Sequence, residues 1–203
     1  MEADWSVEIG GDAPVIETDW PGWIDLAVDI SRIAQLDEVQ NFPPLGEAIM
    51  ELNRANGSFQ TTKCDLWFSD ETVDPFEFDS EPGEHRTTAN CYLDLLPQLL
   101  SQWACLAPAE SWARYVVDTL RAAPCRSARA EIVLRQVPKQ SSIGATLYVN
   151  ACGSTPELAR KALIPALQLA VSILCSAHPN TLPDATKAND SRITIKAESP
   201  AGE

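Results

Sequence analysis

The sequence has few of the side chains that carry chemistry near neutral pH. It holds 2 histidines among 203 residues, and both His85 and His178 lie in polar, turn-like segments. Histidine is the side chain whose unperturbed pKa lies closest to neutrality. A histidine-dependent active site therefore has two candidate residues, and neither lies in an apolar segment.

Motifs for nucleotides and metals are also missing. Gly10-Gly11 lacks the spacing and the following helix of a phosphate-binding loop. The acidic stretch at residues 69–84 offers carboxylate oxygens, but its spacing does not match a calcium-binding loop, and Phe76 and Phe78 interrupt it. We expect a solvated acidic loop whose two Phe side chains reach the core. The sequence predicts no cofactor and no metal site.

Paired-cysteine motifs and long apolar runs are absent as well. None of the 6 cysteines forms a Cys-x-x-Cys pair, so we expect reduced thiols that pack as small buried hydrophobic side chains. The most apolar stretch, residues 162–175, is shorter than the roughly 20 residues that cross a bilayer. The acidic start of the chain does not resemble a secretory signal. We expect one cytoplasmic domain over residues 1–203, with a polar loop at 178–190 and a partly flexible C-terminal end.

Basic residues are scarce in the first half of the chain. Residues 1–100 hold 21 acidic and 4 basic side chains, whereas the remainder holds 8 and 11. The net charge of -14 is therefore concentrated in the N-terminal half. Phosphate groups and anionic membranes are bound by Lys and Arg. The charge distribution predicts neither nucleic-acid nor membrane binding.

Alternating apolar and polar side chains predict strands. The pattern indicates them near residues 5–9, 15–16, 24–30, 62–68, 86–94, 130–135 and 143–151, with a last short one at 192–196. Between the second and the third, Trp20-Pro21-Gly22-Trp23 has the residue order of a type II turn. We expect Trp20 and Trp23 to be the most exposed of the 6 tryptophans and to mark a contact surface.

Helical periodicity covers the intervening regions. Residues 31–39 are weakly helical, and a better helix begins at Pro43-Pro44 and ends near residue 56. Residues 95–123 predict two helices separated at Ala107-Pro108. The longest helix, with Ser154 as its N-cap, runs to about residue 177, and its apolar character predicts burial against the sheet.

These elements predict an α+β fold with an antiparallel β-sheet and with helices packed on one face. Two hairpin–helix units, at residues 63–123 and 130–177, are similar in plan.

The face of the sheet opposite the helices is the best candidate site. It combines aromatic, amide and charged side chains, which suit a polar ligand or a protein partner. The candidate binding residues are Asp65, Trp67, Arg86, Thr88, Asn90, Tyr92, Asp94, Tyr148 and Asn150, beside Lys63, Arg135 and Thr146. The alternative is that these are ordinary residues of solvated strands.

An enzymatic hypothesis is weaker. His85 could pair with Cys64 or Cys91 as a nucleophilic site, or Asp65 and Asp94 could act as paired carboxylates in a small hydrolase-like enzyme. Both cysteines fall on the predicted buried face, where thiols are inert. The sequence favours a non-enzymatic binding protein that uses the open sheet face or the acidic half. The partner would be a protein with a basic surface, a second copy in a homodimer, or a small polar ligand.

Overall fold

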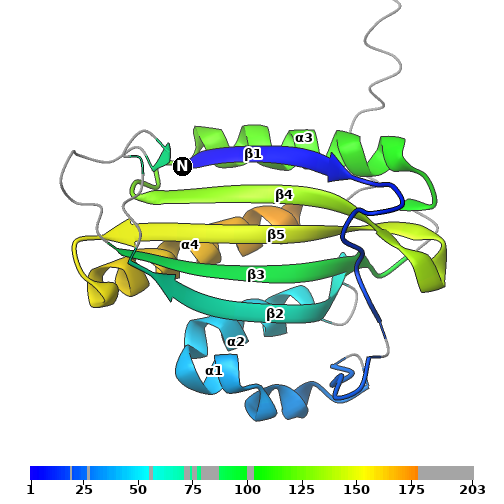
Figure 1. Ribbon diagram of the computed structural model, residues 1–203, viewed down its shortest axis with the longest axis horizontal. Helices are drawn as coiled ribbons and strands as arrows, with labels where there is room; N and C mark the ends of the chain where they lie inside the picture. Colours follow the sequence, from blue (N-terminus) through cyan, green and yellow to red (C-terminus); the bar gives the residue numbers. More distant parts are fainter. Residues whose placement is uncertain are drawn as a thin grey trace, which may run out of the picture.

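A five-stranded sheet forms the centre of the computed structural model. The structure describes residues 1–18, 20–26, 28–54, 57–70, 74, 77–78, 87–99 and 103–177. The strands are β1 (Glu2–Glu8), β2 (Phe59–Ser69), β3 (Thr87–Pro97), β4 (Ala128–Val137) and β5 (Ser142–Gly153). They lie side by side in the order β1-β4-β5-β3-β2, which Figure 1 shows from top to bottom.

The sheet is mixed, because β1 pairs in parallel with β4 while every other neighbouring pair is antiparallel. The expectation of a purely antiparallel sheet was therefore wrong for this edge. A strand with one covered face has the same alternation whatever the direction of its neighbour, so periodicity could not reveal it. The α+β class and the two hairpin–helix units are confirmed.

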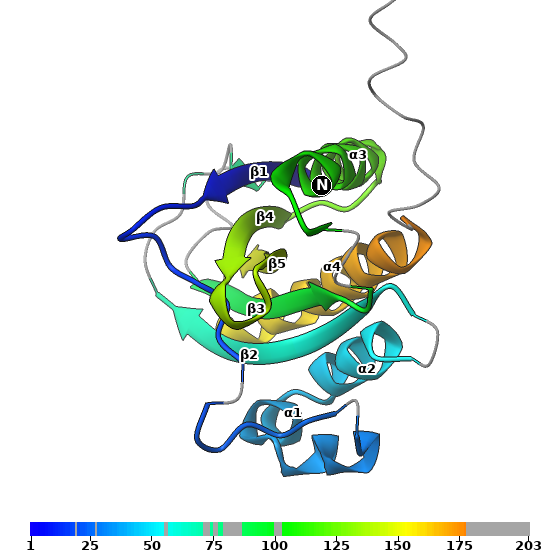
Figure 2. The same cartoon turned by 90° about the vertical axis from the view of Figure 1, so that its right-hand side faces the viewer.

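The helices cover one face of the sheet, as expected. Among the described residues they are α1 (Asp37–Asn41), α2 (Pro43–Leu52), α3 (Leu106–Ala122) and α4 (Pro156–Ser176), with short 3-10 turns η1 (Ile30–Gln35) and η4 (Pro138–Gln140). The helices α3 and α4 pack behind the strands, and α2 lies beside α4 near the β2 edge (Figures 1 and 2).

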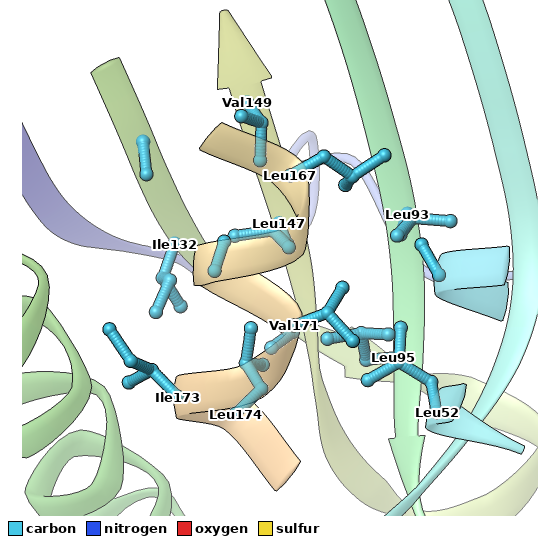
Figure 3. Close-up of a cluster of buried hydrophobic side chains, with 14 of the residues drawn as sticks. Leu52, Leu93, Leu95, Ile132, Leu147, Val149, Leu167, Val171, Ile173 and Leu174 are labelled. Carbon is cyan, nitrogen blue, oxygen red and sulfur yellow. The ribbon is translucent and has the colours of Figure 1, made fainter. Parts of the chain in front are cut away.

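The core fills the space between the sheet and α4. Alternate residues of β3, β4 and β5, including Leu93, Ile132 and Leu147, point toward Leu167 and Val171 of the helix (Figure 3). Each fully buried side chain of this size stabilises the fold by about 1.5–3 kcal/mol. Because strand side chains alternate, this packing places the intervening residues on the opposite face.

The N-cap of α4 lies one residue later than predicted. Thr155, and not Ser154, is the N-cap, and its hydroxyl accepts a hydrogen bond from the Leu158 amide at 3.3 Å. The helix continues through Pro165. By length and composition α4 alone among the described helices could cross a membrane, but here its apolar side chains pack against the sheet and α2.

In the described residues 95–99 and 103–123 the structure has one α-helix, α3, which runs through the predicted break at Ala107-Pro108. Leu95, Leu96 and Pro97 extend β3, because Leu95 is needed in the core opposite Ala145. Pro108 falls in the first turn of α3 and does not separate two helices. A proline is tolerated there, because the first amides of a helix have no partner within it.

The predicted strand at residues 24–30 was also wrong. The Asp29 carboxylate caps η1 by accepting from the Ser31 amide at 3.0 Å, and Asp25 accepts from the Val28 amide at 3.3 Å. Aspartates that bind nearby backbone amides compete with strand pairing. The type II turn is confirmed, with Gly22 at a φ of 95° and a hydrogen bond from the Trp23 amide to Trp20.

Residues 10–18 and 20–26, called the crossing segment below, pass over the uncovered side of the sheet from the end of β1 toward η1 (Figures 1 and 2). Within it, the predicted strand at 15–16 forms no strand. Ile16 instead donates its amide to Gln136 at 2.9 Å and buries its side chain against Leu96 and Val137. The crossing segment thus covers one end of the open face.

The remaining sequence predictions concern the loops, the C-terminal end and the cysteines. The polar loop at 178–190, the strand at 192–196, Phe76 and both histidines lie outside the described residues. Phe78 is buried, as expected. All 6 cysteines are free; Cys91 and Cys152 are buried, but Cys105 is exposed, contrary to the expectation.

Replacing Gly144 by Ala should loosen the contact of the crossing segment. An added Cβ would lie 2.7 Å from Ile16 Cδ1 and 2.9 Å from the Leu95 carbonyl oxygen. We expect urea unfolding to show a loss of about 1–3 kcal/mol. Gly11→Ala is the control, because its Cβ would meet nothing within 4 Å. Equal stability of the two variants would contradict the close packing at Gly144.

Candidate functional site: the open sheet face

The open face of the sheet holds the side chains that point away from α3 and α4. The strand register aligns Asp65, Tyr92, Tyr148 and Glu131 in one row across β2, β3, β5 and β4. Neighbouring rows contain Lys63, Asp94 and Thr146 on one side, and Trp67, Asn90, Asn150 and Arg129 on the other. The structure therefore brings the described candidate residues to one face, and Arg86 lies outside the described residues.

A diagonal row of aromatic rings crosses this face. The Trp67 and Tyr92 ring centroids are 6.3 Å apart, and those of Tyr92 and Tyr148 are 5.7 Å apart. The Arg135 guanidinium lies 5.7 Å from the Tyr148 ring centre. These spacings fall in the range of favourable aromatic and cation–π contacts. We call these four residues the aromatic row; they come from four adjacent strands.

A hydrogen-bond network holds the Arg135 end of the row. The guanidinium donates to Glu8 Oε2 through Nε at 3.0 Å and through Nη2 at 2.8 Å. Its Nη1 donates to Thr146 Oγ1 at 2.9 Å and to the Tyr148 hydroxyl at 3.2 Å. The Thr146 hydroxyl donates to Asp94 Oδ1 at 2.5 Å. The parallel β1 strand, which sequence patterns did not place, supplies Glu8.

Burial changes the protonation equilibria within this network. Burial raises the pKa of Asp94 above its usual value, against the opposing hydrogen bond from Thr146 and the charges of Arg135 and Lys63. Burial alone would lower the pKa of Arg135, but its hydrogen bonds to Glu8 and Tyr148 raise it. The Arg135 guanidinium therefore stays charged while the Asp94 carboxyl binds its proton more readily than an exposed aspartate.

Other predicted residues are less exposed than a solvated strand implies. Thr88 and Asn90 are buried, and the Asn90 amide donates to Thr88 Oγ1 at 3.0 Å. The Asn150 Oδ1 atom is buried and has no hydrogen-bond partner among the described residues. Asp65 is exposed, and 39% of the surface of Trp67 is exposed to solvent. A ligand on this face would contact Asp65 and the aromatic row first.

A cavity of about 270 Å³ lies beside the open face, between the β2 edge and the crossing segment. Its lining includes Trp20 and Trp23, which are half-buried and not exposed as expected. Lys63, Asp65 and Tyr92 belong both to this cavity and to the open face. Sequence reasoning missed the cavity because the path of the crossing segment has no periodic signal.

The geometry does not favour a cysteine nucleophile. Burial raises the pKa of Cys64 to about 12, with added effects from Glu38, Asp65 and Asp94, and burial likewise raises the pKa of Cys91 to about 12. Thiols, unlike thiolates, are poor nucleophiles. Because His85 lies outside the described residues, its pairing with either cysteine stays a prediction.

The paired-carboxylate hypothesis finds only partial support. Asp65 and Asp94 share the open face and lie on adjacent strands, two positions apart in the register. The cavity reaches Asp65, but Asp94 is buried, bonded to Thr146 and not among the lining residues. A substrate in the cavity would contact one carboxylate and not both.

Comparisons with known proteins found no matching family model and no match among curated proteins or solved structures. Within the described part of the chain, no group of three or more His, Cys, Asp or Glu side chains could hold a metal ion. The functional argument therefore rests on the geometry of the described residues.

Asp94→Asn should stabilise the protein at pH 7, because burial disfavours the charged carboxylate. The pKa of Asp94 is higher in the folded protein than in the unfolded chain. The wild type therefore loses stability relative to the variant as the pH rises above the pKa of an unfolded aspartate. The difference should shrink as the pH falls toward about 4. Urea unfolding across this range measures it, with Asp12→Asn as the exposed control. A destabilised, pH-independent variant would contradict the raised pKa.

Thiol labelling of the native protein should distinguish exposed from buried cysteines. At neutral pH we expect a thiol reagent to modify Cys105, and to modify Cys64 and Cys91 more slowly than a model peptide until the chain is unfolded. Mass spectrometry of the labelled peptides gives each rate. Labelling of Cys64 or Cys91 faster than the peptide would restore the nucleophile hypothesis.

Proposed function

We propose that this is a binding protein whose open sheet face holds a protein partner that presents a basic segment. The observation that carries the proposal is the aromatic row, in which Trp67, Tyr92, Tyr148 and Arg135 contact one another across four strands on the uncovered face. Trp, Tyr and Arg are the residue types that contribute most to binding energy at protein interfaces.

Rigidity supports this use of the aromatic row. Arg135 is tied to Glu8, Thr146 and Tyr148, and Asn90 is bonded to Thr88. Side chains already held in one conformation lose little entropy on binding. Ordinary solvated strands, the alternative interpretation, do not need such a network beneath their surface.

The charge of the open face supports a basic partner. Among the described residues of this face, the carboxylates outnumber the basic side chains: they are Glu2, Asp4, Glu8, Asp65, Asp94 and Glu131 against Lys63, Arg129 and Arg135. Rings on an open sheet can also stack nucleic-acid bases, but a phosphate backbone would be repelled by these carboxylates. A Lys- or Arg-rich peptide would be attracted to the face, and salt would weaken that attraction.

Selection from a displayed random-peptide library tests the proposal. We expect wild-type protein to enrich Lys- and Arg-rich peptides, and fluorescence polarisation to show at least about tenfold weaker binding to the variant with Tyr92→Ala and Tyr148→Ala. Tyr115→Ala is the matched control, because this exposed tyrosine lies on α3, on the other side of the sheet.

Three outcomes would contradict the proposal: enrichment of acidic or neutral peptides, equal binding by the two tyrosine variants, or affinity that does not change with salt. A concentration-dependent dimer that the double variant abolishes would instead assign the open face to a second copy of this chain.

A further inference from the structure

The cavity beside the open face has two kinds of wall. The rings of Trp20, Trp23 and Tyr92 supply aromatic surface, while Ile24 and Leu36 supply aliphatic surface. Its volume of about 270 Å³ lies just below the ~300–1,000 Å³ of typical ligand pockets. The cavity therefore suits a small molecule and not a drug-sized one.

Two polar atoms at this cavity lack hydrogen-bond partners in the described part of the chain. The Thr62 Oγ1 atom is buried and unpaired, and 6% of this residue is exposed. The Trp20 Nε1–H group is also buried and unpaired. Buried polar groups are normally satisfied, and leaving one unpaired costs about 1–3 kcal/mol. A ligand oxygen that reaches the indole N–H would satisfy that group.

The charge at the cavity is negative. Glu38 of α1 and Asp65 of β2 line it, opposed by the exposed Lys63, and no described ion pair engages either carboxylate. Asp94, on β3, is the register partner of Lys63. After burial, the charges of Glu38, Asp65 and Asp94 are the causes that raise the pKa of the Cys64 thiol, which also lines the cavity. An anionic ligand would be repelled from this site.

We propose that the cavity binds a small organic cation of the amino-alcohol class, an alkylated ammonium that also carries an oxygen. Aromatic faces attract such cations, which are too large and too weakly hydrated for a carboxylate cage alone. Glu38 and Asp65 balance the charge, the indoles and Tyr92 contact the alkyl groups, and the Trp20 N–H donates to the ligand oxygen. The inference concerns a different ligand from the one proposed for the open face, although the two sites share Tyr92.

Choline, tetramethylammonium and 3,3-dimethylbutan-1-ol form a suitable set of probes. The alcohol has the shape of choline without its charge, and tetramethylammonium has the charge without the oxygen. Calorimetric titration of the full chain should show choline binding, with the neutral alcohol at least about tenfold weaker. Absence of choline binding to the folded protein, or equal binding of the alcohol, would overturn the inference.

Single substitutions assign the contacts. Glu38→Gln should weaken choline binding about tenfold, whereas Asp37→Asn, which removes the same charge from the adjacent exposed position, should not. Trp20→Phe keeps a ring but removes the N–H, so it should weaken choline about fivefold more than tetramethylammonium. Circular dichroism checks that each variant folds.

A readout at the open face separates this inference from the proposed function. Glu38 belongs to α1 and not to the open face, so Glu38→Gln should leave peptide binding unchanged while it weakens choline binding. Equal effects of Glu38→Gln and Asp37→Asn on choline affinity would show that choline binds elsewhere and would overturn the cavity assignment.

Discussion

Burial of alternate side chains on β3, β4 and β5 is the constraint on which the rest of the structure depends. Cys91, Leu93 and Leu95 must meet the helices, as must Ala145 and Leu147 opposite them. The two-residue period of a strand then fixes what the other face displays. A shift of one residue in register would expose the core and bury the aromatic row. The open face is thus specified by the same packing that forms the core.

The uncovered face is not a passive solvated surface, because it carries its own buried network. Arg135 joins the parallel edge strand to the centre of the sheet through Glu8 and Thr146. A partly buried guanidinium such as that of Arg135 is tolerated when its donors are satisfied and its charge is paired. At one end, Ile16 of the crossing segment packs over Gly144 and closes the face. What remains open is the aromatic row and the cavity beside it.

The sequence predicted the central part of this architecture and missed its edges. Alternation placed Tyr92, Tyr148 and Asp94 on one face, because local periodicity decides which way a strand side chain points. It could not give the parallel direction of β1, which depends on a pairing more than a hundred residues away. Nor could it predict that Asp25 and Asp29 would bind backbone amides, or that Trp20 would line a cavity. These features depend on where an irregular segment crosses the sheet.

The most direct test of the account is the mobility of the Arg135 side chain. If the open face is preorganised by the buried network, the NMR order parameter of the Arg135 Nε–H bond should be near 0.85, the value typical of rigid backbone. The exposed Arg126 offers a mobile reference in the same protein. A value for Arg135 below about 0.6, the range of flexible groups, would contradict the central claim that this face is built in advance for binding.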